Sequence, residues 1–136
     1  MRLAARSGTD VRILADSAFV IDYLRGVPEA AARWEAVFAE GDVPIVNEIV
    51  VCEVSAGLLE RDERRFGAFL EPVEFIQPGP DSALLAGRWR AEARAAGRTL
   101  GLADALIAAA AVADNAAVLT RNTRDFALTP VRLVTC

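Results

Sequence analysis

Short runs of apolar residues alternate with longer amphipathic stretches along most of the chain. A short apolar run bounded by polar or turn residues is typical of a buried strand, whereas apolar residues spaced three and four apart indicate a helix. The pattern predicts five strands, at residues 11–15, 43–46, 73–77, 118–120 and 131–134. It also predicts six helices, at residues 19–24, 28–40, 47–60, 61–71, 81–96 and 102–114.

Cap and turn residues lie at several of the predicted boundaries. Pro28 is tolerated in a first helical turn, Asn47 is a frequent N-cap, and Gly97 suits the end of a helix. Because strands and helices alternate, we predict an α/β fold in which helices cover both faces of a parallel sheet. In such sheets, functional groups gather at the carboxyl ends of the strands.

The length of 136 residues corresponds to one domain, and no repeat, linker or change of composition divides the chain. We therefore predict a single domain over residues 1–136, with residues 1–10 as a loose N-terminal leader. Cys52 and Cys136 do not make a disulfide framework or a zinc site, so we interpret both as reduced thiols and Cys52 as a small core residue. No segment approaches the roughly 18 apolar residues of a membrane span, and no signal peptide is apparent. These features favour a cytoplasmic protein without a membrane partner.

The composition restricts the chemistry that the chain can perform. The sequence contains no His, and all 15 basic residues are Arg, so Lys is absent as well. These absences exclude Ser-His-Asp and Cys-His catalysis, Schiff-base chemistry and a Walker A lysine. The remaining metal sites are those built from carboxylates and amides, which suit Mg²⁺ or Mn²⁺.

Three acidic residues lie where such chemistry is expected. Asp16 follows the first strand, Glu53 lies between apolar neighbours in a helix, and Asp104 begins an apolar, alanine-rich helix. Each position also has an ordinary structural interpretation: Asp16 as an N-cap, Glu53 as a surface residue and Asp104 as a favourable charge at a helix N-terminus. Their combination favours the functional interpretation, because crowded carboxylates cannot all stay ionised unless a cation compensates them.

The segment after the fourth strand supplies further candidates. Asn122 and Asp125 can each reach a site at the end of that strand, although both residue types are also frequent in turns. A divalent cation held by such groups can activate water and stabilise the charge of a phosphodiester during in-line displacement. That chemistry requires neither His nor Lys.

Four short segments carry a family resemblance when they are taken in order. They are Ile13-Leu14-Ala15-Asp16-Ser17, Glu53-Val54-Ser55-Ala56-Gly57, Asp104-Ala105-Leu106-Ile107-Ala108-Ala109, and Leu119-Thr120-Arg121-Asn122 with Asp125-Phe126. In this order the chain resembles the PIN-domain ribonucleases, in particular the VapC toxins of bacterial toxin–antitoxin pairs. The resemblance implies a three-layer α/β/α fold with a central parallel sheet of four to five strands. It also implies a Mg²⁺- or Mn²⁺-dependent endoribonuclease with an RNA substrate, a homodimer, and a small cognate antitoxin.

The resemblance assigns roles to individual residues. Asp16 and Asp104 correspond to the principal metal ligands, and Glu53 completes the acidic cluster. The hydroxyls of Ser17 and Thr120 support the neighbouring acids and border the substrate site. The fourth acidic position of the family falls at Asn122, where many relatives have Asp. An amide oxygen is a weaker ligand than a carboxylate, so Asp125 is the alternative fourth group, and a second metal is in question.

The arginines have two interpretations. We expect Arg121 and Arg124, which flank the candidate site, to contact the RNA backbone, because a planar guanidinium matches a phosphate group. We interpret the series at residues 88, 90, 94 and 98 as a solvated helix face. The net charge of −4 is unfavourable for binding RNA, but the distribution of charge matters more than its total.

Two alternatives and one interaction surface remain open. A haloacid-dehalogenase-like phosphatase would use Asp16 as a nucleophile, but it requires a second Asp two residues later, where this chain has Ala18, and a Lys. A degenerate PIN domain acting as a binding module is supported by Asn122. The helices at residues 28–40 and 47–70 offer more apolar surface than one sheet face needs, so we expect a dimer or antitoxin groove there.

Overall fold

A five-stranded parallel sheet forms the centre of the computed structural model, which describes residues 11–135. The predicted leader at residues 1–10, and Cys136, lie outside the described residues. The strands are β1 (Arg12–Ala15), β2 (Val43–Asn47), β3 (Glu74–Ile76), β4 (Ala117–Leu119) and β5 (Leu133–Val134). They are arranged in the order β3-β2-β1-β4-β5, and each adjacent pair is parallel. The predicted α/β class with a parallel sheet is therefore confirmed.

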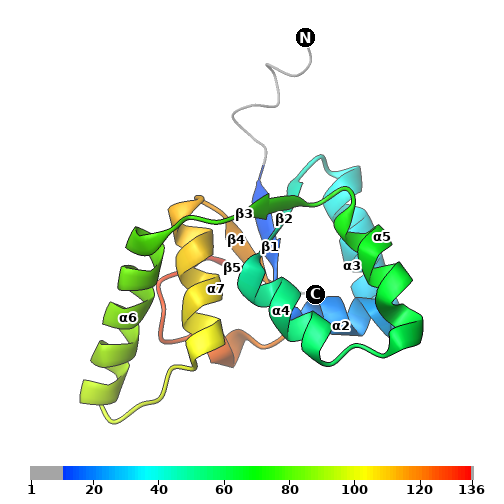
Figure 1. The fold of residues 1–136 in the computed structure, drawn as a ribbon. Coiled ribbons are helices and arrows are strands. Elements are labelled where there is room, and N and C mark those ends of the chain that lie inside the picture. Colours follow the sequence, from blue (N-terminus) through cyan, green and yellow to red (C-terminus); the bar gives the residue numbers. More distant parts are fainter. Residues whose placement is uncertain (1–10, 136) are drawn as a thin grey trace.

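Helices flank the sheet, with α6 and α7 on one side and α2, α3 and α5 on the other (Figure 1). Helix α4 contacts both α2 and α7. The helices are α2 (Ser17–Leu24), α3 (Pro28–Ala39), α4 (Glu48–Ala56), α5 (Glu63–Leu70), α6 (Pro80–Ala95) and α7 (Leu102–Ala113), with short 3₁₀ turns η1 (Glu60–Asp62) and η2 (Thr123–Phe126). All six predicted helices are present.

Two sequence-based predictions on α4 are wrong. The helix predicted over residues 47–60 ends at Ala56, because Gly57 provides its C-cap and the chain then leaves the helical path. Cys52 is exposed rather than part of the core. The buried side of α4 carries Val50 and Val54, which are one turn apart, and Cys52 lies half a turn from each of them.

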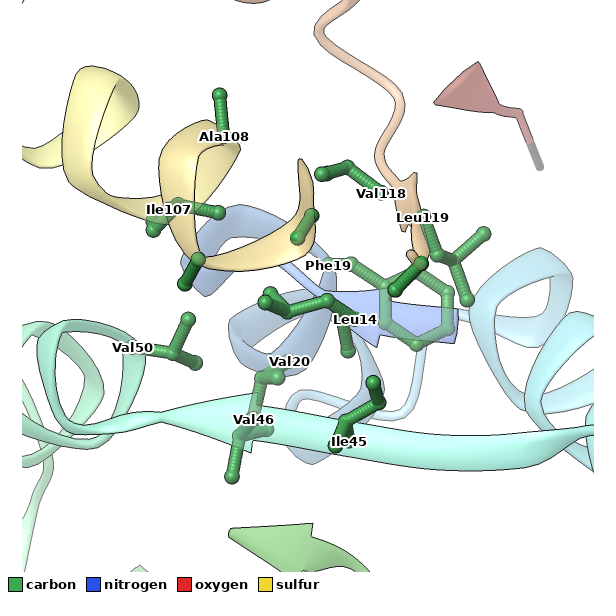
Figure 2. Close-up of a cluster of buried hydrophobic side chains, with 14 of the residues drawn as sticks. Leu14, Phe19, Val20, Ile45, Val46, Val50, Ile107, Ala108, Val118 and Leu119 are labelled. Carbon is green, nitrogen blue, oxygen red and sulfur yellow. The ribbon is translucent and has the colours of Figure 1, made fainter. Parts of the chain in front are cut away.

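The core surrounds the central strand β1. Figure 2 shows Leu14 of β1 between Val46 of β2 and Val118 of β4, with Ile107 of α7 packed over them. Leu14 and Val118 are fully buried, and burial of a side chain of this size stabilises the fold by about 1.5–3 kcal/mol. Helix α7 packs through four consecutive buried alanines at residues 108–111, whose small side chains allow close approach to its neighbours. The first turn of α7 is thereby held close to the carboxyl edge of the sheet.

The amino end of the sheet carries a compensated cluster of charges. The Arg12 guanidinium lies 2.6 Å from an Asp114 carboxylate oxygen and 2.7 Å from one of Glu74. These two partners raise the pKa of Arg12 above its ordinary range. The cluster joins β1 to the start of β3 and to the end of α7. Within residues 11–135, no helix is long and apolar enough to cross a membrane.

Candidate active site

The first site residue lies at the carboxyl edge of the sheet because β1 and β4 are in register there. Ala15 pairs with Leu119, so Asp16 and Thr120 follow neighbouring strands at the same level. The Asp16 N–H donates to the Leu119 carbonyl at 3.1 Å and extends the pairing by one residue. Asp16 is 4% exposed, and the Thr120 hydroxyl donates a hydrogen bond to its carboxylate.

Asp16 has a structural role as well as a place in the site. Its Oδ1 accepts the Phe19 N–H at 2.8 Å, which makes it the N-cap of α2. Burial raises the pKa of Asp16 above its ordinary value, and the nearby Asp125 carboxylate acts in the same direction. The hydrogen bonds from Thr120 and Phe19, and the charge of Arg121, oppose that increase. The N-cap interpretation and the functional interpretation of Asp16 therefore both describe this residue.

Asp104 lies in the first turn of α7, opposite Asp16 across the site. Partial burial raises the pKa of Asp104 to about 6, with additional increases from the charges of Asp125, Glu53 and Asp16. The N-cap position of this helix is Gly101, which has no side chain to accept a backbone N–H. A Cβ atom at position 101 would lie 3.3 Å from Asp104 Oδ2, so glycine leaves room for this carboxylate.

Glu53 approaches from a third direction, on α4. The Ser17 hydroxyl donates a hydrogen bond to Glu53 Oε1 and so links the start of α2 to α4. Glu53 is exposed, which places it at the rim of the site rather than in the core.

The segment after β4 supplies two more polar groups. The Asn122 N–H donates to Thr120 Oγ1 at 2.8 Å, and the Asp125 N–H donates to the Asn122 carbonyl at 3.0 Å. The Thr120 side chain thus connects Asp16 to the turn that carries Asn122. Thr120 is 0% exposed, and its hydroxyl contacts the neighbouring acid Asp16. Its place at the border of the substrate site stays a prediction.

These side chains meet around one cleft with a volume of about 300 Å³. Its polar lining consists of six residues predicted from the sequence: Asp16, Ser17, Glu53, Asp104, Asn122 and Asp125. Ala18, Ile21 and Ile107 complete the lining. Four carboxylates thus face one small volume, and no basic side chain lies among them.

The cleft offers the ligand chemistry of a hard cation. Carboxylate and amide oxygens are the donors that Mg²⁺ and Mn²⁺ prefer. The mutual repulsion that raises the Asp104 pKa is the repulsion that a bound cation would relieve. As the side chains lie in residues 11–135, no group of three acidic or thiol side chains is already arranged to hold a metal ion. The donor set therefore suits a divalent cation.

The two arginines beside the cleft do not line it. The Arg121 guanidinium lies 2.6 Å from Asp22 Oδ2, and Arg124 is exposed on η2. Sequence reasoning missed Asp22, although one signal was available, because it is the only charged residue in the otherwise apolar helix α2. This ion pair fixes Arg121 next to the site, where its charge lowers the pKa of Asp16.

Comparisons with known proteins agree with this geometry. Residues 13–131 match the family model of the PIN domain. The chain is 32% identical over 117 residues to Ribonuclease VapC19 of Mycobacterium tuberculosis, across 86% of this chain and 94% of that relative. A VapBC2 structure from Rickettsia felis, bound to a promoter DNA fragment, has a TM-score of 0.82 at 22% identity and covers 93% of this chain and 99% of its own. A toxin–antitoxin complex from Klebsiella pneumoniae has a TM-score of 0.73 at 31% identity. The match covers 90% of this chain and 96% of the chain in that complex.

Proposed function

Because this chain belongs to the PIN-domain family and, within it, to the VapC ribonucleases, we propose that it is a divalent-metal-dependent endoribonuclease acting as the toxin of a toxin–antitoxin pair. One observation carries the proposal: four carboxylates and Asn122 face a single cleft at the carboxyl edge of the sheet. The substrate is RNA, and the bond that is broken is a phosphodiester.

The chain's own residues divide the work at the cleft. Asp16, Asp104 and Glu53 would hold Mg²⁺ or Mn²⁺, with Asn122 or Asp125 as a further oxygen ligand. When bound, the ion would supply Lewis acidity and charge neutralisation for phosphodiester hydrolysis. Thr120 and the Phe19 N–H fix the orientation of Asp16, while Ser17 fixes that of Glu53. The acids are thus held by neighbours that keep their carboxylates directed to the cleft.

The proposed protein partner is a small antitoxin, which we place on the predicted apolar face. A groove of about 460 Å³ lies between α2, the end of α4 and η1, and arginines line it together with apolar residues. Its apolar lining is Ile21, Leu24, Val54, Leu58 and Leu59. A second hollow of about 400 Å³ shares Leu24 and Arg65 with it and adds the aromatic rings of Tyr23, Trp34, Phe38 and Phe69. An amphipathic helix with acidic residues suits such a groove.

The groove also reaches the acidic cleft, since Ile21 lines both. An antitoxin bound there would therefore cover the approach to the carboxylates. Leu59→Glu places a charge on a side chain that is 54% exposed in the groove. We expect this variant to cleave RNA normally but to escape inhibition by the antitoxin that neutralises the wild-type protein. Normal inhibition of the variant would exclude this groove as the docking surface.

We further propose that the protein acts as a homodimer in the cytoplasm, where its RNA substrate and antitoxin are found. Light scattering coupled to size-exclusion chromatography tests the dimer, and a monomeric mass at working concentration would contradict it.

The central experiment measures RNA cleavage with and without a divalent ion. We expect the purified protein to cleave total RNA at discrete positions in Mg²⁺ or Mn²⁺ and to stop in EDTA. Asp104→Asn should lose cleavage, whereas the matched variant Asp81→Asn, on the exposed first turn of α6, should retain it. Full activity in EDTA would exclude the metal-dependent mechanism. Calorimetry that detects no Mg²⁺ or Mn²⁺ binding to the wild-type protein would instead favour the binding-module alternative.

The phosphatase alternative gains no support. Its second Asp would stand at position 18, and the cleft is lined there by Ala18.

A further inference from the structure

A cluster of arginines lies outside the acidic cleft, at the carboxyl end of α6. Arg90, Arg94 and Arg98 line a small hollow of about 60 Å³, together with Thr99 and Leu100. None of the three guanidinium groups forms an ion pair with a described residue. In a chain whose net charge is −4, such an uncompensated concentration of positive charge suggests a ligand.

The backbone assembles this cluster. Arg90 and Arg94 are one helical turn apart and share a face of α6. After Ala95 the chain reverses at Gly97, whose φ of +74° is readily adopted only by glycine. The Arg98 N–H then donates to the Ala93 carbonyl at 2.8 Å, which brings Arg98 back against the last turn of the helix.

The hollow is anchored as well as assembled. Arg90 Nε donates to the Leu100 carbonyl at 2.9 Å, and the Leu100 side chain is 3% exposed in the core. Arg94 and Arg98 are exposed to solvent. One guanidinium is therefore fixed by the loop, and the other two are available to a ligand.

The opposite side of α6 carries one arginine that is not part of the cluster. Arg88 is exposed but does not line the hollow, and Glu92 lies one turn after it on the same side. The solvated-face interpretation of the arginine series thus holds for Arg88. The other three arginines form a separate cluster around the hollow.

The position of the hollow connects it to the cleft. The loop that follows α6 runs from the cluster through Leu100 to Gly101, the N-cap of α7, and Asp104 lies in the first turn of that helix. Figure 1 shows the end of α6, the start of α7 and η2 at the same end of the molecule. One short loop therefore joins the hollow to the helical turn that carries Asp104.

We infer that Arg90, Arg94 and Arg98 form a phosphate-binding subsite for the RNA backbone, outside the cleft in which the bond is cleaved. This inference rests on the proposed ribonuclease function. Guanidinium groups bind phosphate oxygens in a bidentate manner, and an RNA strand supplies regularly spaced phosphates. The subsite offsets the repulsion between RNA and an acidic protein, and it contributes affinity that does not depend on base sequence.

The test compares two double variants with the same change of charge. Arg94→Gln/Arg98→Gln removes the exposed half of the cluster and leaves Arg90 to hold the loop. The control, Arg64→Gln/Arg88→Gln, removes two exposed arginines that line none of the hollows described above. Both are made in the Asp104→Asn background, so that a fluorescein-labelled, mixed-sequence 20-nucleotide RNA remains intact while anisotropy is measured in Mg²⁺.

We expect the Arg94/Arg98 variant to bind this RNA about 10-fold more weakly than the control, and its dependence of log K on log salt to fall by about 0.7 for each lost contact. Equal affinities and slopes for the two variants would overturn the subsite. So would unchanged RNA binding with loss of binding to polyglutamate, which would assign the cluster to an acidic protein segment. Cleavage of total RNA by the wild-type protein is measured in parallel, because its absence would refute the proposed ribonuclease function itself.

Discussion

The two ends of β1 carry charges that the fold treats in opposite ways. At the amino end, Arg12 contacts two carboxylates and forms a compensated cluster that joins three elements. At the carboxyl end, four residues later, Asp16 faces a cleft whose lining includes three further carboxylates and no basic side chain. The first arrangement stabilises the fold. The second raises the pKa values of Asp16 and Asp104, so it costs stability and is explained by a function.

The largest expected effect is the loss of RNA cleavage on substitution of Asp16, at the carboxyl end of β1. Asp16→Asn should reduce RNA cleavage by about 10³-fold or more, because it removes a carboxylate that the proposed metal requires. Asparagine caps helices as well as aspartate does, so the free energy of unfolding should stay within about 0.5 kcal/mol of the wild type or rise. Asp16→Ala should lose the same activity and in addition about 1 kcal/mol of stability with the cap. Cleavage assays and urea unfolding of both variants check this separation, and an active Asn variant would contradict the assignment.

At the amino end of β1, substitution should lower the stability of the protein and leave its activity unchanged. Arg12→Met removes both ion pairs while keeping an apolar side chain of similar length, so we expect a loss of about 1 kcal/mol in the free energy of unfolding. RNA cleavage per folded molecule should remain unchanged. A double-mutant cycle with Asp114→Asn measures how much of that loss belongs to the Arg12–Asp114 pair. A large fall in activity at full stability would break the distinction between the two ends.

The placement of the site residues at one edge of the sheet could be predicted from the sequence, because the alternation of strands and helices brings the carboxyl ends of parallel strands together. That topology is enough to bring Asp16, Asp104 and Asn122 to one edge, although they are far apart in the chain. The element boundaries depended on local competition instead. The end of α4 at Ala56 was missed because Gly57 outweighed an apolar pattern that continues through Leu58 and Leu59.

Other features depend on side-chain directions that no sequence pattern encodes. The Asp22–Arg121 ion pair joins residues from two elements, and neither position has a spacing that points to the other. Cys52 was assigned to the core from its apolar neighbours, but the helix buries only one side, that of Val50 and Val54. The arginine hollow requires the chain reversal at Gly97, so spacing along a helix alone placed Arg98 with the solvated residues.

The free energy of unfolding should also depend on pH through the acidic cleft at the carboxyl end of β1. The pKa of Asp104 is about 6 in the folded protein and is raised from its ordinary value of 3.8. Such a group contributes stability that is fully present below about pH 4 and is lost as the pH rises through about 6. In metal-free buffer, the free energy of unfolding should therefore increase between pH 7 and pH 5 from this residue, by on the order of 1 kcal/mol after solvent screening. Urea unfolding of wild type and Asp104→Asn checks this, since the wild type should show the larger increase and the variant only the part that the buried Asp16 contributes.

Metal affinity should change in the opposite direction over the same range. Protonation of Asp104 competes with a cation, so Mg²⁺ or Mn²⁺ binding measured by calorimetry should weaken below about pH 6. Identical affinities at pH 5 and pH 7 would remove Asp104 from the proposed ligand set.

The smallest expected effect comes from the glycine beside Asp104. Gly101→Ala adds a Cβ atom 3.3 Å from Asp104 Oδ2, which forces the carboxylate to shift by a few tenths of an ångström. Backbone strain is absent, because φ is −63° at this position. Loss of glycine flexibility in the unfolded chain and the poorer N-cap act in opposite directions, so stability should change by less than about 0.5 kcal/mol. Cleavage should fall a few-fold, and more Mg²⁺ should be needed for half-maximal rate.

The matched control is Gly67→Ala, at a helical position with open space around its Cβ. It should leave the cleavage rate and the Mg²⁺ requirement unchanged. An equal response of the two variants would mean that the position of Asp104 tolerates this displacement.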